Sequence, residues 1–187
     1  MKKLIKINYF RNPPSNLTAK PNFYCQPNSF ENSQSYKSLK QHRDYLLDLL
    51  LALDGVIQSP KYHPESDALY HSLQVFEWAF KETCDPELWL AALFHDIGKS
   101  VDSKKHCEIG AEMVLDIFPS RVIWIIKHHL DLMKNPKQTQ QKLTNKNQLT
   151  DLVKIRKWDL AGRDPNAAVR DVEEALDLVL NISSPPL

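Results

Sequence analysis

The sequence predicts an all-α fold, a compact helical bundle that follows an irregular N-terminal arm. Apolar residues recur at helical spacing from about Ser38 onward, whereas no stretch alternates for long with the two-residue period of a strand. The first 35 residues are rich in Asn, Pro, Ser and Gln and carry no apolar stripe. A length of 187 residues suits one domain, so we expect an arm at 1–37 and a helical domain at 38–187.

Seven segments carry the spacing of a helix, and one of them has clear end signals. In 86–97, Asp85 suits the N-cap, Pro86 suits the first helical position and Gly98 is a natural stop. The polar, basic segment 134–147 is expected to be an exposed loop. The expected helices are 39–54, 67–82, 86–97, 104–118, 120–133, 148–162 and 166–181.

Composition excludes several classes of protein. The net charge is +1, which gives no strong signal for binding duplex nucleic acid. The apolar runs are far shorter than the roughly 20 residues that span a bilayer, and Lys6 and Asn8 interrupt the segment that might serve as a signal peptide. The three cysteines form no CxxC pair, which favours a reduced, cytoplasmic setting.

The stretch LWLAALFHDIGKS places a histidine and an aspartate, His95 and Asp96, at the end of a helix that is apolar on most sides. A buried carboxylate without a partner costs several kcal/mol, roughly 3–5 in measured cases. A metal ion would compensate both side chains at once. If these two residues bind a metal, further ligands are expected on the buried faces of other helices.

Four more candidate ligands stand on apolar stripes of other helices. A single histidine in such a place is more often a hydrogen-bonded core residue, and Asp159 alone would more often pair with Arg156 or Arg163. Their joint occurrence favours a site for one or two divalent transition-metal ions, such as Fe, Mn, Co, Ni or Zn. Cys107 is interpreted as a small core residue. The four candidates are His71, His106, His129 and Asp159.

The order of these residues resembles the H…HD…D pattern of the HD superfamily of metal-dependent phosphohydrolases. The segments HPESDALYHSLQVFEWA, FHDIGKS, HCEIGAE, IIKHHL and DLAGRD are similar, in the same order, to motifs of the HD domain in bacterial CCA-adding tRNA nucleotidyltransferases. The resemblance covers roughly residues 40–181. It implies a helical HD-domain bundle. No paired-carboxylate nucleotidyl site precedes this domain in the sequence, so we expect a stand-alone HD domain that does not add CCA.

The resemblance also implies a role for each ligand. It assigns His71, His95, Asp96 and Asp159 to a first ion. It assigns His106 and either His128 or His129 to a second, with Asp96 bridging the two. His129 is favoured over His128, because its stripe is cleaner and Leu130 follows it. The sequence departs from the family pattern at Ser66, where the family has glycine, and at Cys107, where it has a small residue.

Two cations are candidates for binding the substrate. In the family, the lysine that matches Lys99 commonly contacts substrate phosphate, and Arg163 is placed to do the same. The alternative for both is a solvated cation at a helix end. His63 and Glu65 either line the entrance of the site or form a turn before the helix.

The expected activity is hydrolysis of phosphoesters by metal-activated water, with Asp96 and Lys99 as catalytic residues. The expected partner is a small phosphorylated substrate, such as a 2′,3′-cyclic nucleotide or a nucleoside monophosphate, and no membrane. Nucleoside polyphosphates or single-stranded DNA are alternative substrates. A catalytically silent HD-fold binding module is the alternative from another functional class.

Overall fold

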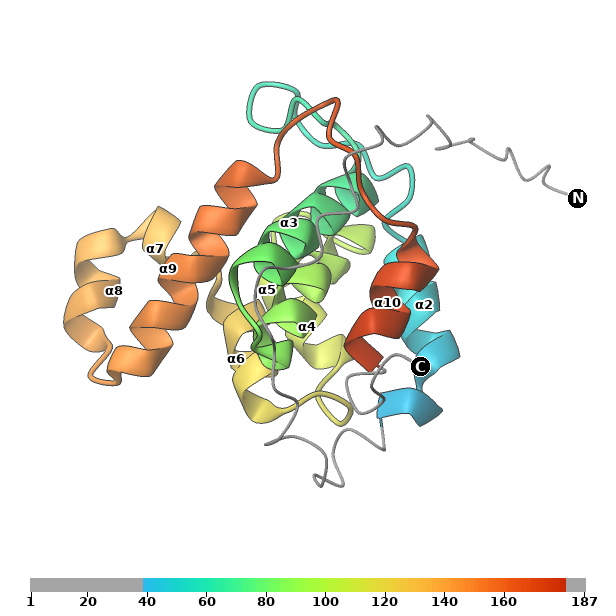
Figure 1. The fold of residues 1–187 in the computed structure, drawn as a ribbon. Helices are drawn as coiled ribbons and strands as arrows, with labels where there is room; N and C mark the ends of the chain where they lie inside the picture. Colours follow the sequence, from blue (N-terminus) through green and yellow to red (C-terminus); the bar gives the residue numbers. More distant parts are fainter. Residues whose placement is uncertain (1–38, 181–187) are drawn as a thin grey trace, which may run out of the picture.

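The computed structural model describes residues 39–180, so the arm expected at 1–37 lies outside the described residues. Within 39–180 the chain forms helices and no sheet, with a single isolated bridge between Ile57 and Asp67. This confirms the all-α prediction. The helices, labelled in Figure 1 except for the short η1, are α2 (Arg43–Leu51), α3 (Ala68–Glu82), α4 (Pro86–Phe94), η1 (Ile97–Ser100, a 3-10 turn), α5 (His106–Met113), α6 (Ser120–His128), α7 (Asp131–Lys134), α8 (Pro136–Lys142), α9 (Lys146–Ala161) and α10 (Val172–Leu180).

The segment 134–147 is not the exposed loop that its polarity predicted, because it contains α8. Lysine and glutamine have good helix propensity, and Pro136 occupies the first turn, where a missing N–H costs nothing. The buried Thr139 ties α8 to α7, since its hydroxyl donates to the carbonyl of Asp131 at 3.1 Å. A helix of this composition has no apolar stripe for sequence reasoning to detect.

The last helix begins later than the expected residue 166. Side chains of α3 hold the preceding segment in an irregular path: Gln74 donates to the carbonyl of Asp164 at 2.9 Å and Tyr70 to that of Ala167 at 2.6 Å. Asp171 then caps the new helix by accepting from the backbone N–H of Glu173 at 2.8 Å. Contacts with α3 therefore override the local helical pattern.

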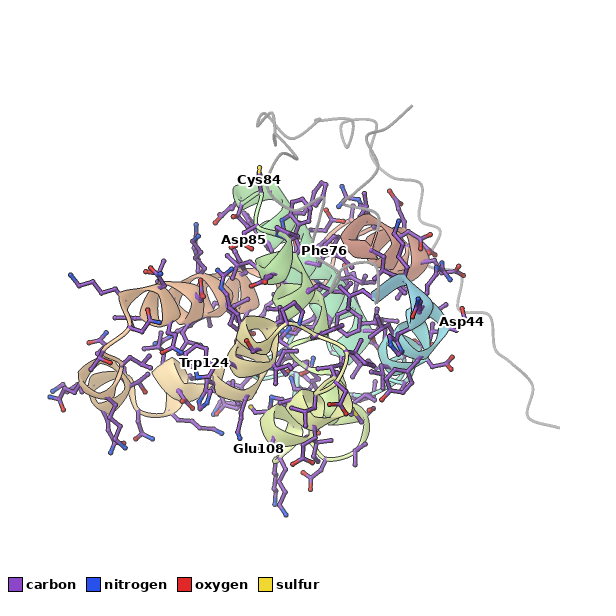
Figure 2. All side chains as sticks on the ribbon, turned by 90° about the horizontal axis from the view of Figure 1, so that it is seen from below. Asp44, Phe76, Cys84, Asp85, Glu108 and Trp124 are labelled. Carbon is purple, nitrogen blue, oxygen red and sulfur yellow. The ribbon has the colours of Figure 1, made fainter. Side chains whose placement is uncertain are left out.

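Helix α4 lies at the centre of the bundle, where it packs against α3, α6, α9 and α10 (Figure 1). All of its residues except Glu87 are buried. In Figure 2, Phe76 lies within the bundle, whereas Asp44 and Glu108 lie at its outside. Because of this packing, the end of α4, which is followed by His95 and Asp96, is held deep in the protein.

No helix within residues 39–180 is long and apolar enough to cross a membrane.

Two glycines allow the close contacts that assemble the site. A Cβ on Gly98 would lie 2.2 Å from the carbonyl oxygen of His106, so only glycine lets η1 pack on α5 in this way. A Cβ on Gly162 would lie 2.8 Å from Cγ2 of Val75, where the end of α9 meets α3. The first contact brings Asp96 close to His106, and the second brings the end of α9 to α3.

Candidate metal centre

The candidate ligands come from the ends of five helices. His71 lies in the first turn of α3 and His106 begins α5, whereas His95 and His129 directly follow α4 and α6. Asp159 lies in the last turn of α9, and Asp96 lies between α4 and η1. The structure brings these six side chains into one cluster, and all six residues are buried.

Each of the four clustered imidazoles directs Nδ1 at the backbone and Nε2 at the interior of the cluster. In each, Nδ1 lies at hydrogen-bond distance from a backbone carbonyl, so we assign the proton of the neutral ring to Nδ1. The lone pair of Nε2 then faces the interior of the cluster. The Nδ1 contacts are His71 to Gly162 at 2.8 Å, His95 to Ala92 at 2.9 Å, His106 to Ser103 at 2.8 Å and His129 to Ile126 at 2.7 Å.

Asp96 lies between two pairs of imidazoles. Its Oδ2 is 3.3 Å from Nε2 of His95 and 3.9 Å from Nε2 of His71. Its Oδ1 is 3.2 Å from Nε2 of His106 and 3.7 Å from Nε2 of His129. Each carboxylate oxygen therefore faces its own pair of nitrogen donors, which is the arrangement that two ions sharing one carboxylate require.

Two close contacts fit a cation better than they fit neutral side chains. Nε2 of His71 lies 3.1 Å from Oδ1 of Asp159, yet it makes no hydrogen bond, because in the neutral ring it offers a lone pair to another acceptor. Nε2 of His106 lies at hydrogen-bond distance, 3.3 Å, from Nε2 of His129, although in two neutral rings protonated at Nδ1 both atoms are acceptors. A proton or a metal ion is needed in each place. The nitrogen and oxygen donors are those that borderline divalent metals prefer.

Without metal, protons take the place of the cations on His71 and His106. Burial lowers the pKa of His71, but contacts with Asp159 and Glu65 outweigh it and raise the pKa to about 9. Burial likewise lowers the pKa of His106, but Asp96 raises it to about 10. A metal ion bound at these two histidines would displace the protons, so its binding would tighten as the pH rises.

Asp96 and His129 are held in the forms that bind metal. Burial favours the neutral form of Asp96, but positive charge on His95 and Lys99 holds its pKa well below the usual range. Burial and charge on His95 lower the pKa of His129 to about 3. At neutral pH Asp96 is a carboxylate and His129 is a neutral imidazole.

Lys99 and Arg163 lie beside the cluster in a pocket of about 430 Å³. The ammonium of Lys99 is 2.5 Å from Oδ2 of Asp96. The guanidinium of Arg163 donates to Oδ1 of Asp159 at 3.0 Å and to the carbonyl of Tyr62 at 3.0 Å. The pocket therefore presents two cations next to the candidate metal ligands.

Of the two adjacent histidines, the structure brings His129 and not His128 to the cluster. Nδ1 of His128 lies 2.8 Å from Oδ2 of Asp131, and its ring packs on Trp124 with centroids 4.9 Å apart. One third of the His128 side chain is exposed, whereas His129 is buried.

Glu65, expected from the sequence either to line the entrance of the site or to form a turn before the helix, contacts the ring of His71. Its buried Oε1 accepts from Nδ1 of His71 at 2.8 Å and from Nδ1 of His63 at 2.7 Å. The turn that directs it inward includes Ser66, whose φ of 59° is a conformation that favours glycine. The signal in the sequence was an acidic residue in HPES just ahead of the helix that carries His71.

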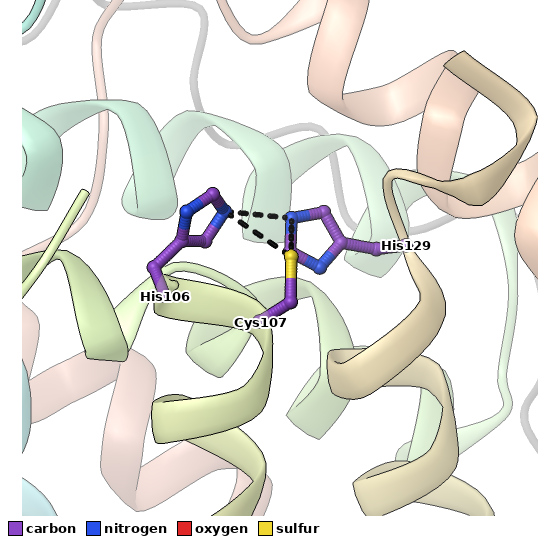
Figure 3. Close-up of side chains that lie close together, drawn as sticks. All are labelled: His106, Cys107 and His129. Carbon is purple, nitrogen blue, oxygen red and sulfur yellow. Dashed lines mark hydrogen bonds between the residues drawn. The ribbon is translucent and has the colours of Figure 1, made fainter. Parts of the chain in front are cut away.

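Cys107, which was interpreted from the sequence as a small core residue, lies beside the candidate ligands His106 and His129. Figure 3 shows its sulfur facing the imidazoles of His106 and His129. The distances from Sγ to their Nε2 atoms are 3.6 Å and 4.0 Å.

Comparisons with known proteins show which family the helical domain is similar to. A family model described as HD domain matches residues 68–175. The Multifunctional CCA protein of Methylococcus capsulatus is 47% identical over 49 residues, which are 26% of this chain and 12% of that protein. Its counterpart in Hahella chejuensis is 40% identical over 72 residues, or 35% and 17%. In Vibrio vulnificus the identity is 29% over 138 residues, or 60% and 34%. The chain thus spans 34% or less of the length of these relatives.

Proposed function

Since the chain belongs to the HD-domain family, whose fold is that of metal-dependent phosphohydrolases, we propose that its buried cluster of histidines and aspartates hydrolyses phosphoesters. The observation that carries the proposal is the convergence of four imidazole Nε2 atoms on the two oxygens of one carboxylate. A structural role alone does not require four lone pairs to face the same buried acceptor.

Two sets of side chains would each hold one ion. His71, His95, Asp159 and Oδ2 of Asp96 form the first set, and His106, His129 and Oδ1 of Asp96 belong to the second. Fe, Mn, Co, Ni and Zn suit such donors better than Mg or Ca does. A bound divalent ion lowers the pKa of a water molecule and polarises phosphoryl oxygens, which is the chemistry that hydrolysis needs.

The residues at the pocket bind and orient the phosphate. Lys99 neutralises negative charge that develops on the phosphoryl oxygens, and Arg163 offers paired N–H donors to the same group. Glu65 and the carbonyl of Gly162 fix the ring of His71, so that its Nε2 stays directed at the cluster. Asp96 holds the two halves of the centre in register.

The proposed substrate is a small nucleotide, with 2′,3′-cyclic nucleotides and nucleoside monophosphates preferred. A pocket of about 430 Å³ suits a ligand of that size. Ile57, Tyr62 and Met133 line the pocket and offer apolar surface to a base or a sugar. The resemblance to the HD domains of CCA-adding enzymes points to the same substrate class.

The test is a hydrolysis assay on the full chain after treatment with EDTA and reloading with Mn, Co, Ni, Zn or Fe. The panel contains cyclic nucleotides, nucleoside monophosphates, nucleoside polyphosphates and single-stranded DNA. We expect turnover only in the presence of metal, with cyclic nucleotides among the better substrates. Activity that resists EDTA, or no hydrolysis by a metal-loaded protein, would contradict the proposal. Hydrolysis confined to polyphosphates or to DNA would overturn the substrate alone.

A variant of Lys99 separates phosphate binding from metal binding. Lys99→Ala is expected to lower kcat about 100-fold, because a donor to the developing charge is lost. The metal content should remain that of the wild type. Lys127→Ala, which removes an exposed lysine of α6, is the matched control and should leave both quantities unchanged.

A further inference from the structure

Three donor atoms lie together on the second side of the proposed metal centre, and a carboxylate oxygen lies close to two of them. Nε2 of His106 and Nε2 of His129 lie 3.3 Å apart, and Sγ of Cys107 lies 3.6 Å and 4.0 Å from them (Figure 3). Oδ1 of Asp96 lies 3.2 Å and 3.7 Å from the same two nitrogens. All four residues are at least 95% buried, so solvent does not compete for these atoms.

These separations are those of a tetrahedral metal site. With metal–nitrogen bonds of about 2.0 Å and a metal–sulfur bond of about 2.3 Å, two nitrogens lie about 3.4 Å apart and a nitrogen and a sulfur about 3.6 Å apart. The observed distances between Sγ and the two nitrogens exceed that value by at most a few tenths of an ångström. The two nitrogens and the sulfur therefore need only small side-chain adjustments to bind one ion.

The first side of the centre differs in its donor chemistry. His71, His95 and Asp159 supply nitrogen and oxygen atoms, and within residues 39–180 no cysteine joins this group of ligands. The sulfur lies on the second side alone because Cys107 is next to His106 in the first turn of α5. Alanine would fill a core position among apolar groups equally well. A sulfur that faces two imidazole nitrogens can also donate a lone pair to a metal ion that those nitrogens bind.

We propose that Cys107 binds the second ion as a thiolate, together with His106, His129 and Oδ1 of Asp96. This inference rests on the metal centre proposed above. Formation of the metal–sulfur bond releases the thiol proton to solvent, and no oxidant or reductant is involved. Because a thiolate is a soft ligand, the second position selects Zn, Co or Fe over Mn, whereas the first position accepts Mn as well.

Cobalt spectroscopy tests this proposal directly. Metal-free full-length protein is titrated with Co²⁺ under anaerobic conditions, and absorption is recorded from the near ultraviolet to the visible. The wild type is expected to develop a thiolate-to-cobalt charge-transfer band in the near ultraviolet as its second ion binds. Cys107→Ser and Cys107→Ala should lose that band completely. His71→Ala, which damages only the first position, should keep it.

Three results would overturn the proposal: two cobalt ions bound by the wild type without the band, a band unchanged in Cys107→Ser, or no cobalt binding at all. Circular dichroism establishes that each variant is folded, and alanine and serine both fit the space of a cysteine. The hydrolysis assay separates this proposal from the proposed function. Hydrolysis without the band contradicts the thiolate alone, whereas the band without hydrolysis contradicts the phosphohydrolase alone.

Discussion

At the scale of single residues, the proposed metal centre depends on which nitrogen of each imidazole lacks a proton and can bind a metal ion. Backbone carbonyls of four different segments hold the Nδ1 atoms, and this leaves the Nε2 atoms directed at Asp96. The backbone therefore fixes the ligand orientation before any ion binds. Such preorganisation makes the effect of each single substitution specific to one side of the centre.

The adjacent histidines of α6 provide a matched pair of variants. His129→Ala is expected to lose the second ion and keep the first, because Nε2 of His129 faces Oδ1 of Asp96. His128→Ala should keep both ions, since the His128 ring contacts Asp131 and Trp124 instead. Metal content per chain, measured after dialysis, distinguishes the two. Equal metal content in both variants would show that the centre holds one ion without His129.

Glu65 is a positioning residue for the first ion. Glu65→Gln keeps the size of the side chain but removes the negative charge that His71 and His63 contact. We expect the first ion to bind roughly 10-fold more weakly, in line with other carboxylates behind a metal-bound imidazole. The cobalt–thiolate band of the second ion should not change, which a general loss of structure would not permit. An unchanged affinity at the first position would contradict this role.

Sequence reasoning identified the candidate ligands because histidine and aspartate are conspicuous on an apolar stripe. It left open whether Glu65 lines the entrance of the site or forms a turn, and it interpreted Cys107 as a core residue, both for physical reasons. A small buried cysteine suits a core and a metal site equally well, and only its distance to His129, which is 22 residues away in the chain, distinguishes them. The inward path of Glu65 depends on the positive φ of Ser66, which no periodicity reveals.

The centre depends, at the scale of the helices, on the contact between η1 and α5. Gly98→Ala places a Cβ against backbone atoms of His106, so one element must shift. We expect destabilisation by about 3 kcal/mol, the upper end of overpacking costs, together with loss of the second ion. Urea denaturation measures the first effect and metal content measures the second.

Gly55→Ala is the comparison for that variant. Nothing lies within 4 Å of a Cβ at this position, so only its φ of +78° is unfavourable, at about 1 kcal/mol. A Gly98→Ala protein that is no less stable than Gly55→Ala would contradict the proposed packing.

Helices with an apolar stripe could be predicted from the sequence, and those without one could not. Helix α4 was predictable from its end signals and its apolar run, and α3 and α9 were predictable from their apolar stripes. Helix α8 is polar on nearly all sides and shows no such period. The late start of α10 follows from hydrogen bonds to α3, more than 80 residues earlier in the chain.

At the scale of the whole molecule, the metal-free folded state carries a proton on Nε2 of each of two buried histidines, His71 and His106. These two protons make the stability of the fold depend on pH. The pKa of His71 is about 9 and that of His106 about 10 in the folded protein, against about 6.5 in an unfolded chain. Because both pKa values are raised in the folded state, protonation of these two histidines stabilises the fold fully below a pH of about 6.5. This contribution to stability is lost as the pH rises toward 9 and 10.

The metal-loaded protein should not show this loss, because the ions have replaced the protons. We therefore expect the difference in Tm between cobalt-loaded and EDTA-treated protein to widen as the pH rises above about 6.5. Thermal unfolding at a series of pH values measures it, and His128→Ala should behave like the wild type. A difference that narrows with rising pH would contradict the assignment of these protons.

Residues 68–175 match the HD domain, and the relatives that share this region are much longer than this chain. The most direct test of the metal centre is anomalous diffraction at the cobalt edge from crystals of cobalt-loaded protein. We predict two cobalt peaks on opposite sides of Asp96. One should lie about 2 Å from the Nε2 atoms of His71 and His95, and the other about 2 Å from those of His106 and His129. Absence of any peak in contact with Asp96 would contradict this prediction.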